Sequence, residues 1–127
     1  GRLNNRWDDI YATNGTIQTS DANDKTSIED SDLGLNFLSQ LNPRKYKLMN
    51  GESNRTHYGL IAQEVKNVLD NNKINTSDFA PYIKGEILDT NNQGTGEYKT
   101  GLRYTEFISI LIKAIQELEQ RIEQLEN

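Results

Sequence analysis

The sequence predicts an α+β domain that ends in a coiled coil, and three observations support this prediction. Helical and strand-like apolar patterns follow one another between residues 33 and 104. From residue 108 onward, large apolar residues recur at alternating spacings of three and four. The 127 residues suit one domain, yet only 34% of them are hydrophobic. So small and polar a chain is marginally stable unless neighbouring chains extend its core.

The composition excludes several kinds of site and partner. The chain has no Cys and one His, His57, so it lacks the thiolates and paired imidazoles of most zinc sites. We therefore expect no metal and no cofactor. The net charge of −5 argues against a nucleic-acid partner. No apolar run approaches the roughly 20 residues that span a bilayer, so no membrane partner is expected.

The first 32 residues are polar. Residues 7–19 alternate weakly around Asn14-Gly15, a dipeptide that favours the tight turn of a β-hairpin. Residues 20–32 are nearly all turn and capping residues, which predicts an exposed loop. Taken alone, Ser20 and Asp21 are typical of a helix cap or Asx turn, and Lys25 of a solvated lysine.

Residues 33–104 predict a three-stranded antiparallel sheet with two short helices. The leucines of residues 33–41 have helical spacing, and Pro43 stops that helix. A second helix over residues 62–72 is predicted from one apolar stripe: Ile61, Val65, Val68 and Leu69. Strand-like runs occupy residues 45–49, 82–88 and 98–104, and an Asn- and Gly-rich connector predicts that the last two form a hairpin.

Residues 105–127 predict a self-associating coiled coil. Its three heptads have Ile at every a position and Leu at every d position: Ile108, Leu111, Ile115, Leu118, Ile122 and Leu125. Ile at a with Leu at d favours two strands in model systems. Arg121 and Glu126 instead fit the R-h-x-x-h-E pattern of short trimeric coiled coils, in which Arg pairs with Glu of the next chain. The pattern thus leaves two and three strands open.

Four segments of the chain carry motifs that occur together in one known protein family. Residues 20–25 (SDANDK) fit the pattern S-D-x-x-x-K, and residues 33–43 (LGLNFLSQLNP) are similar to an L-G-L-x-F-I-x-x-L-x-P helix. Residues 59–65 (GLIAQEV) have the sequence G-L-I-A-Q-E-V, and the terminal heptads are preceded by Tyr104. In this order, the four segments resemble the C-terminal intramolecular chaperone domain of phage tail spikes and tail fibres, the self-cleaving peptidase S74 family, which closes in a coiled coil.

The resemblance implies a homotrimer that aligns three copies of an upstream β-stalk of the same polypeptide and then cuts itself off. It implies three parts: the end of the stalk in residues 1–19, the chaperone domain in residues 20–104 and the trimerisation helix in residues 105–127. Assembly would take place in the host cytoplasm, and the released domain would be absent from the mature virion. The alternative is a non-catalytic trimerisation and attachment module that stays on its fibre.

The same resemblance places the scissile bond between Thr19 and Ser20. It implies that Ser20 is the nucleophile and Lys25 its general base, a pairing that needs neither His nor Cys. Asp21 is then expected either to orient the turn or only to cap it.

This chain departs from the family pattern just before the lysine. Family members usually carry a basic and then an apolar residue there, and this chain has Asn23 and Asp24. A neighbouring carboxylate favours a charged ammonium, whereas a general base must be neutral. Cleavage is therefore expected to be slow, or to depend on the burial of Lys25 when the trimer assembles.

The G-L-I-A-Q-E-V signature supplies the chaperone motif: Gly59, Ala62, Gln63 and Glu64. The Gln63-Glu64 pair is a candidate polar surface for contact with the stalk. The alternative is an ordinary exposed helix face.

Overall fold

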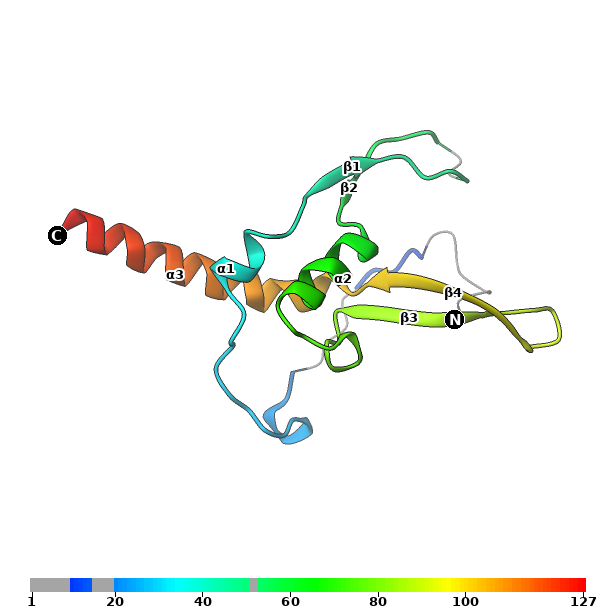
Figure 1. Ribbon diagram of the computed structural model, residues 1–127, viewed down its shortest axis with the longest axis horizontal. Coiled ribbons are helices and arrows are strands. Elements are labelled where there is room, and N and C mark those ends of the chain that lie inside the picture. Colours follow the sequence, from blue (N-terminus) through cyan, green and yellow to red (C-terminus); the bar gives the residue numbers. More distant parts are fainter. Residues whose placement is uncertain (1–9, 15–19, 51–52) are drawn as a thin grey trace. The chain divides into compact units, whose positions relative to one another are not determined.

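The computed structural model describes residues 10–14, 20–50 and 53–127 (Figure 1). The chain divides into two compact units, residues 1–30 with 85–99 and residues 31–84 with 100–127. The predicted hairpin at residues 7–19 lies mostly outside the described residues, and its described part, residues 10–14, contains no strand. Within the parts described, the fold is α+β, as predicted.

The first unit contains a 3-10 turn and the outer part of a β-hairpin. The turn is η1 (Ala22–Asp24), and the hairpin pairs β3 (Tyr82–Leu88) with β4 (Gly94–Leu102). The Asp89 side chain closes the hairpin loop by accepting hydrogen bonds from two backbone N–H groups, at 2.8 and 2.9 Å. Because Asn and Asp side chains readily replace backbone acceptors in turns, the polar connector forms the predicted hairpin.

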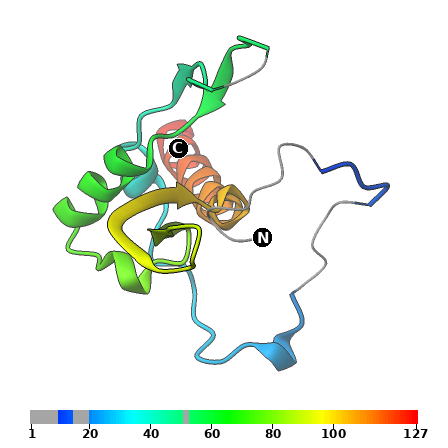
Figure 2. The same cartoon turned by 90° about the vertical axis from the view of Figure 1, so that its right-hand side faces the viewer.

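The second unit holds the remaining elements. These are α1 (Leu35–Leu38), β1 (Arg44–Tyr46), β2 (His57–Gly59), α2 (Ala62–Asn71), η2 (Thr76–Asp78), η3 (Tyr104–Phe107) and α3 (Ile108–Glu126). Figures 1 and 2 show α1 and α2 on the same side of α3. Among the described elements, no other helix lies against the C-terminal part of α3 (Figure 1).

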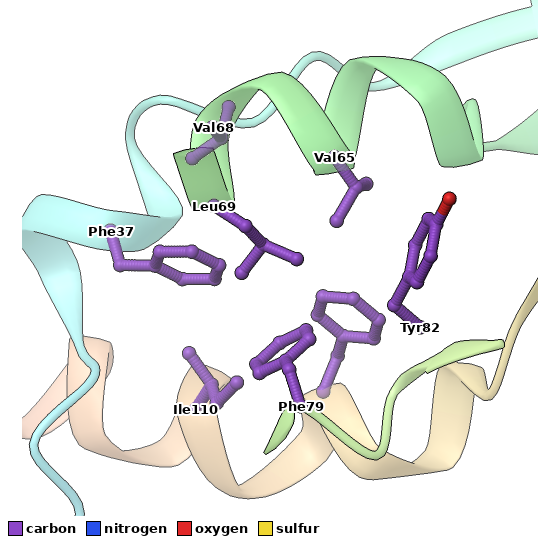
Figure 3. Packing of buried hydrophobic residues seen from close by; sticks show 8 residues of the cluster. Phe37, Val65, Val68, Leu69, Phe79, Tyr82 and Ile110 are labelled. Atoms are coloured by element: carbon purple, nitrogen blue, oxygen red, sulfur yellow. The ribbon is translucent and has the colours of Figure 1, made fainter. Parts of the chain in front are cut away.

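The core of this unit lies between α1, α2 and the start of α3 (Figure 3). Leu69 is fully buried, and Phe79 contacts Phe37 and Phe107 edge to face, with ring centroids 6.0 and 6.1 Å apart. The other buried members are Val65, Val68, Tyr82 and Ile110. The apolar stripe predicted for α2 is confirmed at three positions, whereas Ile61 stands before the helix and is 40% exposed.

The predicted three-stranded sheet is wrong, because the described residues form two separate two-stranded antiparallel sheets. The predicted strand at residues 45–49 pairs with β2, which the sequence did not indicate, and Tyr46 lies opposite His57 in that ladder. β2 is only three residues long, too short to show the alternation by which strands are recognised. The first helix is also shorter than predicted, because α1 ends at Leu38 in 3-10-type hydrogen bonds.

Candidate functional site

The helix α3 has two apolar faces, and among the described residues one of them packs into the core while the other is largely exposed. Phe107, Ile110 and Ala114 are buried in the core of the second unit. The predicted a and d residues lie on another face and are 43–86% exposed: Ile108, Leu111, Ile115, Leu118, Ile122 and Leu125. We call these six residues the heptad stripe.

Two charged residues beside the heptad stripe, Arg121 and Glu126, take part in neither of the ion pairs described, Arg44–Glu64 and Lys66–Asp70. The long C-terminal helix is thus confirmed, while its pairing with other copies stays a prediction.

The second candidate site is the pair Ser20 and Lys25 in the first unit. Lys25 Nζ donates a hydrogen bond to Ser20 Oγ at 2.8 Å. The turn η1 brings them together: the Asp24 N–H bonds to the Asp21 carbonyl, and the Lys25 N–H to the Ala22 carbonyl, each at 3.1 Å. Both side chains of the pair are exposed. Thr19, on the other side of the predicted scissile bond, lies outside the described residues.

Asp21 has a structural role in this turn. Its carboxylate oxygen accepts a hydrogen bond from the Asn23 N–H at 2.9 Å, so it caps η1. Of the two predicted roles for Asp21, capping is the one that this geometry displays.

The third candidate site is the first turn of α2 with the residues before it, which hold the G-L-I-A-Q-E-V signature. The Tyr104 hydroxyl donates a hydrogen bond to the Leu60 carbonyl at 3.2 Å and accepts one from the Leu60 N–H at 2.9 Å. A Cβ atom on Gly59 would lie 2.6 Å from that hydroxyl oxygen, so only glycine fits there without displacement. Ala62 is half-buried against the core.

The two polar residues of the signature contact two different strands. Glu64 forms a two-pronged ion pair with Arg44 of β1, from Arg44 Nε to Glu64 Oε1 at 3.0 Å and from Nη2 to Oε2 at 2.6 Å. The hydrogen bond from Arg44 holds the pKa of the Glu64 carboxyl below its usual value, although partial burial opposes this. Gln63 Nε2 donates to Thr100 Oγ1 of β4 at 3.2 Å.

Sequence reasoning missed the partners of these side chains. Arg44, Thr100 and Tyr104 lie 20, 37 and 44 residues from the groups that they contact. The position of Tyr104 just ahead of the heptads was noted, but nothing in the sequence pattern connects Arg44 or Thr100 with the signature.

In the described ranges, no three or more His, Cys, Asp or Glu residues lie together in a way that could hold a metal ion. In the same ranges, no helix is both long and apolar enough to cross a membrane.

Comparisons with known proteins point to the same family as the sequence motifs. Residues 20–73 match the family model for peptidase S74, described as the chaperone of endosialidase. The fold is similar to the crystal structure of a novel intramolecular chaperone, with a TM-score of 0.63 and 22% identity, covering 80% of this chain and 99% of that one. No curated protein matches the sequence significantly.

A second similar structure is the carboxy-terminal domain of the bacteriophage T5 L-shaped tail fibre with its intramolecular chaperone domain. The TM-score is 0.64 at 18% identity, and the match covers 94% of this chain and 34% of that one. At such identities the two structures establish a shared fold. With the family match, they confirm the resemblance that the motifs predict.

Proposed function

We propose that this chain, whose residues 20–73 match the peptidase S74 family model, is an intramolecular chaperone that trimerises and registers an upstream phage β-stalk of the same polypeptide. After assembly it cuts itself off between Thr19 and Ser20. The observation that carries the proposal is the heptad stripe, which is exposed along the whole of α3.

The heptad stripe favours association because of its exposed apolar area. Burying a side chain such as Ile or Leu stabilises a structure by about 1.5–3 kcal/mol, and the heptad stripe holds six of them. Soluble monomers rarely expose so long a contiguous apolar surface. Arg121 and Glu126, which have no ion-pair partner in the described chain, favour three strands over two.

A trimeric clamp solves a specific difficulty in the folding of a β-stalk. Pairing long strands from three chains costs much chain entropy before any contact compensates for it. Once three copies are joined at one end, these encounters become intramolecular at a high effective concentration. Releasing the clamp afterwards leaves a stalk that persists because it unfolds slowly.

The contact between Ser20 and Lys25 supports a self-cleavage step. A neutral Lys25 amine would take the proton of the Ser20 hydroxyl while Oγ bonds to the Thr19 carbonyl carbon. The peptide C–N bond would then break, and the Ser20 nitrogen would take up the proton. Water would hydrolyse the resulting ester, leaving a carboxylate on Thr19 and a free amine on Ser20.

Because Lys25 is exposed in the single chain, we expect cleavage to require assembly of the trimer. A lysine becomes a base when burial removes water from its ammonium group, and Lys25 is exposed in the single chain. A neighbouring copy in the trimer would supply this burial. On this proposal, assembly takes place in the host cytoplasm and the released domain is absent from the mature virion.

The test is a longer polypeptide that carries an upstream stalk. We expect wild type to release a fragment that begins at Ser20, and Ser20→Ala to abolish this release. Lys25→Arg keeps a charged hydrogen-bond donor but removes the base, so it should assemble without cleavage. Ser31→Ala is the matched control and should cleave normally.

The alternative, a non-catalytic trimerisation and attachment module, is favoured by the engaged Asp21 carboxylate and the exposed Lys25. An intact wild-type polypeptide by mass spectrometry after full assembly would contradict self-cleavage and leave this alternative.

A further inference from the structure

We propose that Gln63 and Glu64 are positioning residues, which hold the bases of the two β-hairpins on the first turn of α2. This differs from the expectation that the pair forms a polar surface for the stalk. The last experiment below rests on the proposed chaperone function, whereas the first does not.

Both oxygens of Glu64 are engaged within its own chain. Each accepts a hydrogen bond from Arg44, in the parallel two-pronged geometry that makes such pairs strong. The Glu64 side chain is 28% exposed, against 48% for that of Arg44. A partner that took Glu64 as its contact would therefore have to share the carboxylate with Arg44.

The position of Arg44 explains what this ion pair does. Arg44 is the first residue of β1 and lies opposite Gly59, the last residue of β2. The ion pair therefore holds the base of the β1–β2 hairpin, at the end nearest to α2.

Gln63 plays the same part for the other hairpin. Its partner, Thr100, lies near the end of β4. The next residue, Gly101, lies against Ile83 of β3, because a Cβ atom there would be 3.2 Å from that side chain. The hydrogen bond from Gln63 therefore holds the base of the β3–β4 hairpin.

Tyr104 connects this turn to the trimerisation helix. Its hydroxyl bonds both backbone groups of Leu60, just before α2, and its own residue begins the 3-10 turn that leads into α3. The first turn of α2 thus joins the bases of both hairpins to the start of the helix that carries the heptad stripe.

The first experiment compares Arg44→Glu, Glu64→Arg and the charge-swapped double variant of the present chain by amide hydrogen exchange. Each single variant should accelerate exchange in residues 44–46 and 57–59 roughly two- to tenfold, since like charges replace the pair. The double variant should restore slow exchange. Lys66→Met breaks the other ion pair, which lies within α2, and should leave these amides unchanged. Unchanged exchange in both single variants, or a double variant as fast as the singles, would overturn the proposal.

The second experiment separates positioning from direct contact, in a polypeptide with an upstream stalk. The single variants should lower the yield of trimeric stalk severalfold, and the charge swap should restore it, because the hairpin is held again. If the swapped variant shows slow exchange but still assembles poorly, Glu64 contacts the stalk directly and the inference is wrong. If deleting α3 does not impair assembly, the chaperone function fails instead, and the exchange data alone decide the role of Glu64.

Discussion

Two candidate sites differ in the range of their contacts. The segment with Ser20 and Lys25 is stabilised by short-range hydrogen bonds, and the first turn of α2 by long-range ones. The hydrogen bonds described within residues 20–25 join residues at most five positions apart. The first turn of α2 and Leu60 just before it are held by side chains 20, 37 and 44 residues away. Long-range contacts fix a scaffold within one chain, whereas a local turn brings two reactive groups together without the supporting contacts of a rigid active site. Partner chains are therefore expected to complete the first region more than the second.

The largest expected effect comes from removing the partners. If the proposed trimer forms, deleting residues 116–127, or replacing Ile115 by Asp in the middle of the heptad stripe, should turn it into a monomer and slow the proposed cleavage by orders of magnitude. The deletion removes apolar contacts from the proposed coiled-coil core, and the substitution introduces a charge there. Light scattering measures the mass, and mass spectrometry measures the cleavage.

Gln116→Asp is the control for this prediction, because it introduces the same charge at the next position, outside the heptad stripe. It should remain trimeric and cleave. A trimer that persists after the deletion would contradict the clamp, and fast cleavage by a monomer would contradict completion by partner chains.

A core substitution should weaken the scaffold strongly. Leu69 is fully buried, so Leu69→Ala should lower the free energy of unfolding by about 2–5 kcal/mol, measured by urea denaturation. The same substitution at Leu48, which is 54% exposed, is the control and should have little effect. Equal effects at both positions would contradict the described core.

The close approach of Gly59 and Tyr104 predicts a non-additive pair of substitutions. Gly59→Ala should destabilise by about 1–3 kcal/mol, because its new methyl group meets the Tyr104 hydroxyl. In a Tyr104→Phe background the nearest atoms would be the Tyr46 hydroxyl oxygen at 3.3 Å and the ring carbon at 3.4 Å, so Gly59→Ala should cost less, although Tyr46 must still shift slightly. A double-mutant cycle of unfolding free energies measures the coupling. Strict additivity would show that the hydroxyl does not fill this space.

The smallest expected effect is on the pH dependence of the free energy of unfolding in acid. Because Arg44 lowers the pKa of Glu64 in the folded chain, its contribution to stability is present above the ordinary carboxyl pKa. That contribution is lost as the pH falls through the lowered value. Glu64→Gln should therefore lose part of the acid dependence of unfolding, measured between neutral pH and pH ~3. Identical pH profiles for the two proteins would contradict a folded-state ion pair.

The parts of the fold that the sequence predicted correctly have either a repeating apolar pattern or typical turn residues. The apolar stripe of α2 and the heptads of α3 repeat over several turns, and the loop at Asp89 has typical turn chemistry. The pairing of β1 with β2 could not be predicted, because three-residue strands carry no such pattern. Without that pair, the strands were assigned to one sheet rather than two.

The candidate sites also differ in how far the sequence pattern could predict them. Ser20 and Lys25 were recognised because a motif six residues long contains both, and the structure brings Lys25 Nζ to 2.8 Å from Ser20 Oγ. The roles of Gln63 and Glu64 depend on Thr100 and Arg44, which only the folded chain brings near. A polar pair on a helix looks the same in sequence whether it faces water, a partner or a distant strand.

The brevity of the heptad stripe has a consequence for alignment. If three copies pair along it, the six residues make six layers, and a slip by one heptad leaves two of the six without a counterpart. The penalty for misalignment is then a third of the core, whereas a coiled coil of ten heptads would lose a tenth. A shifted pairing therefore loses a larger fraction of the binding energy when the stripe is short. Such a stripe would favour the pairing in which three parallel chains start at the same residue.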